Sequence, residues 1–304
     1  AQLSKNSILW RIPDASVQRE PIQVIHELPA SQTHSITVTG DEAGGVRMWD
    51  PRICSTNGNS NSSRSAASSR SNARPLGCVQ SWKQHEDYIS GIEHSNDGNT
   101  LIVSSADCTL SVYDLRMASQ TTGSEKAIRR SDDQGDELLS VKIMKNGRKV
   151  VAGTGEGVLH GWSWGTWGDV SDRFPGHPTS IDALLKVDEN TLLTGSSDGL
   201  IRAVSIHPDK FLGILGDHDG FPIEKLEFNA DRKLVGSVTH DNIIRLWDAS
   251  LLEENDVDDE DDEEQEGTTD VKMGFASQTA SAVATGQGSD DEWDDMDEES
   301  EDED

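Results

Sequence analysis

The chain has 304 residues, and its 26 lysines and arginines stand against 56 aspartates and glutamates, a formal net charge of −30. Only 33% of the residues are apolar, whereas a typical globular domain has roughly 45–50%. No apolar run approaches the ~20 residues that span a bilayer, so we expect no membrane partner. Three cysteines without a CxxC pair argue against a disulfide framework or a cysteine zinc site. The acidic balance argues against direct nucleic-acid binding and favours basic partners.

The first predicted strands lie near the N-terminus, around Val38 and over residues 46–50. Residues 55–75 follow, a stretch rich in serine, asparagine and arginine that cannot bury a core, so we predict a disordered insert. The pattern then returns, with a middle strand around Val103 and a third strand over residues 110–114. Polar turns with glycine, asparagine or aspartate separate the strands, as in consecutive β-hairpins.

Three more units follow at shorter intervals. Their middle and third strands are predicted around Val151 and over 158–162, around Leu193 and over 200–204, and around Val235 and over 243–248. From Val38 onward the middle strands are spaced 65, 48, 42 and 42 residues apart, and removing the 21-residue insert from the first interval leaves 44. A period of about 40–45 residues is typical of WD repeats. We therefore predict an all-β fold, a WD-repeat β-propeller with five blades within residues 1–252.

Short motifs at the strand ends carry the resemblance to the WD-repeat family. Met48-Trp49-Asp50, Val112-Tyr113-Asp114 and Leu246-Trp247-Asp248 resemble the ends of WD-repeat third strands. That family has a buried tetrad of histidine, serine or threonine, aspartate and tryptophan. The resemblance assigns this tetrad in the last unit to His218, Ser237, Asp241 and Trp247.

The other units match the tetrad less completely. The second unit offers His85, Asp107 and Tyr113, and the fourth offers His177, Thr194 and Asp198 but has Ala203 and Val204 where the tryptophan belongs. The first unit has Ala43 at the position of the turn aspartate, and the third has Glu156 there without a matching histidine.

Longer stretches resemble the WD repeat-containing protein 55 family. They are residues 85–90, 141–151, 171–174 (SDRF), 180–182 and 193–208 (LTGSSDGLIRAVSIHP). The resemblance implies a seven-bladed propeller, so about two blades are expected to precede Ala1. It also implies a scaffold that binds preribosomal factors during ribosome biogenesis and rRNA processing, in the nucleus and nucleolus, with the cytoplasm left open.

A second hypothesis is a substrate receptor of a cullin-RING ubiquitin ligase. Its damaged-DNA-binding adaptor reads WD repeats that end in W/Y-D-x-R, and two units fit, with Asp50 and Arg52 in the first and Asp114 and Arg116 in the second. An arginine just after a strand can meet an acidic partner. The first copy is weaker because Ala43 replaces the acid of the longer motif.

The residue pattern gives no positive sign of catalysis. Glycines alternate at Gly153, Gly155 and Gly157, but no helix follows, so we interpret them as a tight β-turn and not a dinucleotide loop. The His/Asp clusters around His85 and His218 fall where the tetrad histidine belongs, and no serine lies in a nucleophile elbow. We therefore predict no enzyme, no cofactor and no metal site.

An aromatic cluster interrupts the third unit. We expect Trp162 and Trp164 to pack between blades, and Trp167 either to cover a blade edge or to form an exposed interaction surface. Arg173 either pairs with a neighbouring acid or presents a charge on the rim of the propeller.

The C-terminal segment, residues 253–304, holds 24 acids and a single base, a net charge of −23. Such blocks repel themselves, so we predict disorder. The segment is either a solubilising extension or a docking arm for basic proteins, with an affinity that falls as salt rises. Trp293 stands alone between acids, a pattern suited to a basic groove with one apolar pocket.

Overall fold

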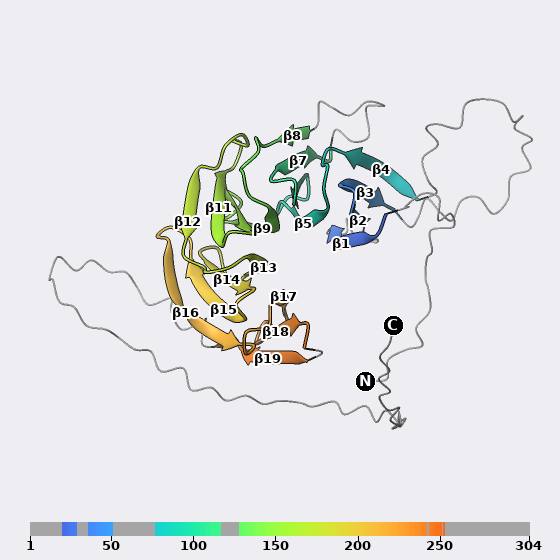
Figure 1. Cartoon of the computed structure of the whole chain (residues 1–304). Helices are drawn as coiled ribbons and strands as arrows, with labels where there is room; N and C mark the ends of the chain where they lie inside the picture. The colour runs from blue at the N-terminus through green and yellow to red at the C-terminus, as the bar shows by residue number, and fades with distance from the viewer. Residues whose placement is uncertain are drawn as a thin grey trace, which may run out of the picture.

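The computed structural model describes residues 20–28, 36–50, 77–116, 128–241, 243–250 and 252. Within these ranges every regular element longer than a turn is a β-strand, and no helix is long and apolar enough to cross a membrane. The strands form five antiparallel sheets that follow one another in an arc around a common centre (Figure 1). The prediction of an all-β propeller with five blades is confirmed.

Each sheet is one blade, and its strands follow the chain from the centre outward. The first three blades consist of β1 (Ile22–Leu28), β2 (Ile36–Asp41), β3 (Gly45–Trp49) and β4 (Cys78–Lys83); β5 (Ile89–His94), β6 (Thr100–Ser105), β7 (Leu110–Asp114) and β8 (Ile128–Arg130); and β9 (Leu138–Met144), β10 (Lys149–Thr154), β11 (Val158–Ser163) and β12 (Asp172–Pro175). The last two consist of β13 (Ile181–Lys186), β14 (Thr191–Ser196), β15 (Leu200–Ser205) and β16 (Lys210–Asp217); and β17 (Ile223–Phe228), β18 (Leu234–Thr239) and β19 (Ile244–Asp248).

The predicted strands fall on the observed ones. The five middle strands are β2, β6, β10, β14 and β18, and the five third strands are β3, β7, β11, β15 and β19. Middle strands such as β6 are buried along nearly their whole length, because the second, third and fourth blades each have a neighbour on both faces. Their sequences are therefore continuous apolar or small-residue runs and not alternating ones.

Apolar side chains between neighbouring blades form the core. Four buried clusters, one at each blade-to-blade junction, hold the five blades together. At the first junction Trp82 and Tyr113 pack with their ring centroids 4.8 Å apart. At the last junction the Trp247 side chain packs beside Gly216, where a Cβ would lie only 2.7 Å from the ring. Glycine at 216 is thus required by the close approach of the next blade.

The described arc does not close on itself. Each inner strand contacts the inner strand of the next blade, from β1 to β17, but β17 has no comparable contact with β1. On the outward face of the last blade, Val238, Ile244 and Leu246 are exposed. An apolar sheet face of this kind is where another blade would pack. Seven blades in the natural protein remain a prediction, and the insert at 55–75 and the acidic segment 253–304 lie outside the described residues.

The run of Gly153, Gly155 and Gly157 in the third blade leads into the hairpin turn between β10 and β11, but its glycines are required for different reasons. Only Gly157 of the three has a positive φ, 80°. A Cβ at Gly157 would lie 2.5 Å from the carbonyl oxygens of both His177 and Thr179 in the loop that enters the next blade. Gly153 is instead needed because the Ile181 carbonyl oxygen approaches it closely. The turn interpretation holds, and of the three glycines only Gly157 uses a positive φ.

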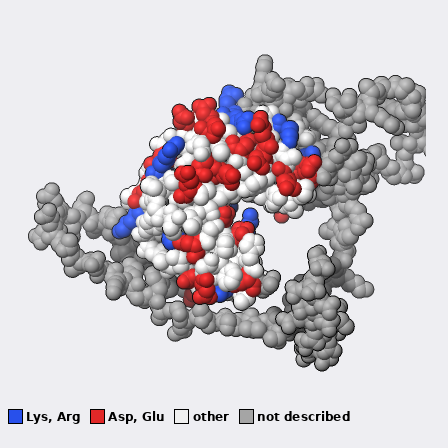
Figure 2. Space-filling view, in the orientation of Figure 1, with Lys and Arg blue, Asp and Glu red and all other residues white. Residues whose placement is uncertain are grey.

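Charge on the propeller itself is also mostly acidic. Figure 2 shows acidic side chains spread over this face of the blades, with most of the lysine and arginine side chains toward its outer margin. No broad basic patch covers the face shown. This distribution fits the expectation of basic partners better than that of a phosphate backbone.

Candidate functional site

The last blade brings together the four residues assigned to its tetrad. The Trp247 indole Nε1 donates to Ser237 Oγ (2.7 Å), and His218 Nε2 lies 2.5 Å from the same oxygen. His218 and Ser237 are fully buried. The last link is long: His218 Nδ1 and Asp241 Oδ2 are 3.9 Å apart. Asp241 instead accepts hydrogen bonds from Thr239 Oγ1 and the Ile243 amide, so it mainly shapes the turn.

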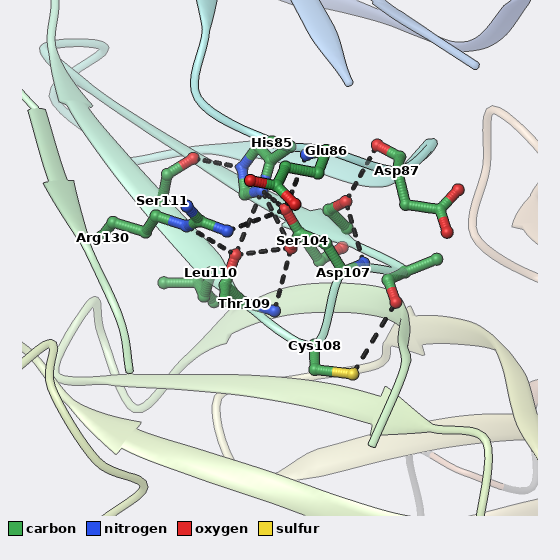
Figure 3. Close-up of polar contacts among 12 residues, drawn as sticks. His85, Glu86, Asp87, Ser104, Asp107, Cys108, Thr109, Leu110, Ser111 and Arg130 are labelled. Atoms are coloured by element: carbon green, nitrogen blue, oxygen red, sulfur yellow. Dashed lines mark hydrogen bonds and ion pairs between the residues drawn. The ribbon is translucent and has the colours of Figure 1, made fainter. Parts of the chain in front are cut away.

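The second blade contains a tighter network, centred on His85 and Asp107 (Figure 3). His85 Nδ1 lies 3.0 Å from Asp107 Oδ2, and His85 Nε2 lies 2.5 Å from Ser111 Oγ. The Ser111 hydroxyl in turn donates to the Tyr113 hydroxyl oxygen (3.0 Å). Asp107 also accepts from the amides of Glu86 and Thr109, and from the guanidinium of Arg130 in β8 at 3.0 Å.

Register explains why a serine from the third strand takes part. Ser237 in β18 pairs with Arg245 in β19, and the equivalent pair in the second blade is Val103 with Ser111. The middle strand therefore has no hydroxyl at this position, and Ser111 supplies one from across the ladder. In the last blade Arg245 occupies the position equivalent to Ser111, and in the second blade Arg130 from the outer strand provides the charge instead.

Asp107, His85 and Ser111 have the connectivity of a hydrolytic triad. However, Ser111 is fully buried in β7, and both of its neighbours in the network are held inside the blade junction. A nucleophile needs an accessible oxygen and donors aimed at the developing oxyanion. The arrangement therefore serves to join the loop that carries His85 to the strands of its blade.

The remaining blades have partial networks. Trp49 donates to Thr39 in the first blade (2.8 Å), and His177 pairs with Thr194 in the fourth (2.8 Å). In the third blade Ala152 occupies the hydroxyl position, because it pairs with His160 as Ser237 pairs with Arg245. The buried Trp162 Nε1 is consequently without a hydrogen-bond partner among the described residues.

The W/Y-D-x-R motif of the second blade ends in an exposed arginine. Arg116 follows β7, its side chain is 66% exposed, and it forms a two-pronged ion pair with Asp114 through Nε (2.9 Å) and Nη2 (2.7 Å). The pair fixes the guanidinium plane at the blade rim. In the first blade Asp50 is buried at the end of β3, and Arg52 lies outside the described residues.

The aromatic cluster of the third blade divides between core and surface. Trp162 is fully buried, but Trp164 is 37% exposed, so the expectation that it packs between blades is wrong. β11 ends at Ser163, and Trp164 therefore begins the following turn instead of continuing the strand alternation. Trp167 is partly buried against the junction of the second and third blades and meets Trp164 edge to face. This placement matches the edge-covering alternative more closely than a free surface.

Arg173 in β12 is exposed and forms no ion pair with a described acid. It thus presents a positive charge on the outer edge of the third blade. Trp293 lies outside the described residues.

Comparison with known protein families agrees with the placement of these networks. The family described as "WD domain, G-beta repeat" matches residues 76–114 and 209–248, which contain β4–β7 and β16–β19. These two matches end in the blades with the most complete polar networks. They also show that one sequence repeat supplies the outer strand of one blade and three strands of the next.

Relatives that match over most of the chain identify the family more closely. WD repeat-containing protein 55 of Arabidopsis thaliana is 38% identical over 257 residues, covering 83% of this chain and 64% of that protein. The chain belongs to the WD repeat-containing protein 55 family. WD repeat-containing protein JIP5 of Cryptococcus neoformans var. neoformans serotype D is 34% identical (80% and 59% covered), and WD repeat-containing protein 55 of Rattus norvegicus is 33% identical (74% and 51% covered). The chain thus spans about half to two thirds of the length of these relatives.

Two of the stretches that carry the resemblance to the WD repeat-containing protein 55 family meet in space. Asp172 of the SDRF stretch lies 3.2 Å from His207 of the SIHP stretch, Oδ2 to Nε2. Beside them Phe174 packs on Phe211, with ring centroids 5.0 Å apart. The contact joins the outer strand of the third blade to the β15–β16 turn of the fourth, and sequence reasoning could not find it because Asp172 and His207 are 35 residues apart in the chain.

Burial sets the charge state of several histidines in these networks. Desolvation lowers the pKa of His177 to about 4, helped by the nearby Arg202 guanidinium. Desolvation also lowers the pKa of His218 and His160, with Arg245 and Arg173 respectively adding to the effect. The pKa of Asp107 is also lowered, but for a different reason. Its burial works to raise its pKa, but hydrogen bonds from His85 and Thr109 hold it well below the usual value.

Stability is expected to fall between pH 7 and pH 5. The pKa of His177 is lower in the folded state than in the unfolded one, so its contribution is present above pH 6.5 and is lost as the pH falls toward 4. This single group accounts for about 2 kcal/mol between pH 7 and pH 5. Aspartates with lowered pKa values change the free energy of unfolding only below this pH range. Urea unfolding at several pH values between 7 and 5 measures how steeply the free energy of unfolding falls with pH. His177→Gln should make this fall shallower. Equal slopes for the two proteins would contradict the role given to His177.

Proposed function

We propose that this protein is a noncatalytic scaffold that holds protein partners during ribosome biogenesis and rRNA processing in the nucleolus. One observation carries the scaffold part of the proposal. Among the described residues, the set with the connectivity of a hydrolytic triad, His85, Asp107 and Ser111, is used inside a blade junction. WD-repeat propellers generally mediate protein–protein interactions through the loops and rims that such junctions hold in place.

The family supports the ribosomal part of the proposal. Members of the WD repeat-containing protein 55 family are associated with the nucleolus and rRNA processing, and the acidic surface and C-terminal segment suit basic ribosomal partners. The test is depletion of the natural protein followed by analysis of precursor rRNA. We expect intermediates of precursor-rRNA processing to accumulate after depletion. Re-expression of the protein should return them to their normal level. Normal precursor rRNA after full depletion would contradict the ribosomal role.

A substrate receptor of a cullin-RING ligase is the second candidate. The exposed Arg116 at the end of β7 favours it, because the Asp114 carboxylate holds the guanidinium in one orientation that an acidic adaptor surface can meet. Receptor and scaffold roles are compatible on one propeller, since a rim contact leaves other loops free.

Arg116→Ala is expected to weaken co-purification of the damaged-DNA-binding adaptor at least severalfold while leaving stability within about 0.5 kcal/mol. The reason is that the only side-chain hydrogen bonds of Arg116 among the described residues go to the partly exposed Asp114. Arg173→Ala is the matched control, since it removes another exposed arginine from a different blade. The Arg52→Ala and Arg116→Ala double variant tests the weaker copy. Unchanged adaptor recovery from the double variant would remove the basis of the receptor hypothesis.

Removing residues 253–304 is expected to reduce binding to basic proteins at low salt and to leave the melting temperature nearly unchanged. The segment holds −23 of the net charge of −30, so its attraction for a basic protein should fade as ionic strength rises. The control is the full chain with the acids of the segment replaced by asparagine and glutamine. Identical binding of all three proteins at every ionic strength would contradict a docking role for the segment.

A further inference from the structure

Two histidines and a glutamate from different blades converge near the centre of the arc. His26 lies on β1 of the first blade, and Glu93 and His94 end β5 of the second, two inner strands that lie side by side (Figure 1). The ligand atoms of all three side chains lie within 4.8 Å of one another, and all three residues are partly buried. His26 Nε2 and His94 Nδ1 are only 2.7 Å apart.

The chemistry of this trio matches a transition-metal site better than a packing contact. Each neutral imidazole has one lone-pair nitrogen, and here two ring nitrogens point at each other with a carboxylate beside them. Two histidines and one glutamate form the ligand set of one well-known class of zinc site.

Among the described residues, Lys142 is the neighbour that works against a cation. Its ammonium lies 2.7 Å from Glu93 Oε2. However, the lysine side chain is 30% exposed and can turn toward solvent, while the other carboxylate oxygen of Glu93 is not needed for this pair. The histidines need only a small movement. Two nitrogens on a tetrahedral zinc ion stand about 3.3 Å apart, roughly 0.6 Å more than the observed spacing.

We propose that His26, Glu93 and His94 bind a zinc ion that ties the first blade to the second at the centre of the propeller. Three protein ligands leave a fourth position for water or for a side chain of a partner. The sequence does not reveal this site, because the nearest ligands are adjacent in one strand and the third lies 67 residues away in the other.

A second trio provides an internal control. Asp172, His207 and Asp209 also bring their ligand atoms within 4.8 Å, but only one of the three residues is partly buried and only one is a histidine. Exposed carboxylates bind zinc weakly in water. His207→Ala therefore removes a histidine from a comparable cluster without touching the inner strands.

The experiment is zinc titration of the metal-free full chain by calorimetry, at an ionic strength that screens the acidic segment. We expect one tight site in the unmodified protein, an unchanged site in His207→Ala, and a loss of affinity on the order of 100-fold in His26→Ala and in His94→Ala. Zinc should also raise the melting temperature of the first two proteins and not of the last two. Cobalt should give the intense visible bands of a four-coordinate ion in the same two proteins.

Glu93→Gln keeps the shape of the side chain but loses its charge, so it tests the site if an alanine variant does not fold. It should weaken zinc binding while the apo protein melts as usual. Zinc affinities that are equal in the unmodified protein, Glu93→Gln and His94→Ala would overturn the proposal and assign the binding to the acidic segment or to other surface groups. Absence of a zinc-dependent rise in melting temperature would overturn it as well.

Discussion

Replacing Asp107 by alanine is expected to destabilise the propeller by roughly 3 kcal/mol. The Asp107 carboxylate is nearly buried and accepts bonds from His85, Thr109 and Arg130 and from two backbone amides. Its removal leaves the fully buried His85 ring without a partner at Nδ1 except the Thr109 hydroxyl. In thermal melts the loss should lower the melting temperature by about 10 °C.

Two controls separate this network from general charge loss. Asp169→Ala removes an exposed carboxylate for which the structure shows no bond to a described residue, and it should change the melting temperature little. Asp241→Ala should fall between the two, because Asp241 stands 3.9 Å from His218 and mainly holds its own turn. If Asp107→Ala and Asp169→Ala have the same melting temperature, the stability of the second blade does not depend on the network drawn in Figure 3.

Gly157→Ala is expected to cost roughly 3 kcal/mol or more. The substitution meets two penalties at once. A φ of 80° disfavours any residue with a Cβ by about 1–2 kcal/mol, and the new Cβ would be pressed to 2.5 Å from the carbonyl oxygens of His177 and Thr179. Those carbonyls belong to the loop that starts the fourth blade, so relieving the clash loosens the junction between blades.

Gly147→Ala isolates the first penalty. Gly147 has the same φ of 80°, but a Cβ there would meet nothing within 4 Å. It should therefore lose only about 1–2 kcal/mol. Urea unfolding of both variants measures the difference, which reports the close approach of the blades at Gly157. Equal losses would mean that the next blade yields freely and that the junction is softer than its geometry indicates.

The strand pattern was predictable from the sequence because each blade repeats the same solution to the same burial problem. Middle strands centred on Val103, Val151 and Leu193 lie between two neighbouring blades, so their apolar runs stand out against the polar turns. The period of the repeat then predicts the propeller without any pairwise contact being known. The strand-end motifs and the longer stretches were enough to predict the family.

The polar networks were predictable in full only where a unit keeps every expected residue type; in incomplete units the sequence predicted pairs such as His85 with Asp107 and His177 with Thr194, but not the whole network. His218, Ser237 and Trp247 follow the family pattern, and the structure brings them together. In the second blade Ser111 replaces a hydroxyl missing at Val103, and only the cross-strand register shows that the two positions face each other. Register is a property of paired strands, so a reading of single strands misses such an exchange.

Contacts between distant segments were beyond the sequence for a related reason. Trp164 was expected between blades together with Trp162, but β11 ends at Ser163, so Trp164 begins the following turn. His26 and His94 meet because two inner strands lie side by side, and no spacing along the chain indicates which residues of those strands align. Both cases depend on where an element ends or how far it slides against its neighbour, which local patterns leave open.

The most direct measurement of the scaffold role is affinity purification of the full-length natural protein from nucleolar extract, with its partners identified by mass spectrometry and precursor rRNA quantified in the same samples. Purification with the unmodified protein and with Arg116→Ala, in parallel, separates the two candidate functions. We expect preribosomal proteins and precursor rRNA to be enriched to the same extent with both. Recovery of the cullin adaptor without preribosomal factors, lost on Arg116→Ala, would contradict the ribosomal scaffold and favour the receptor.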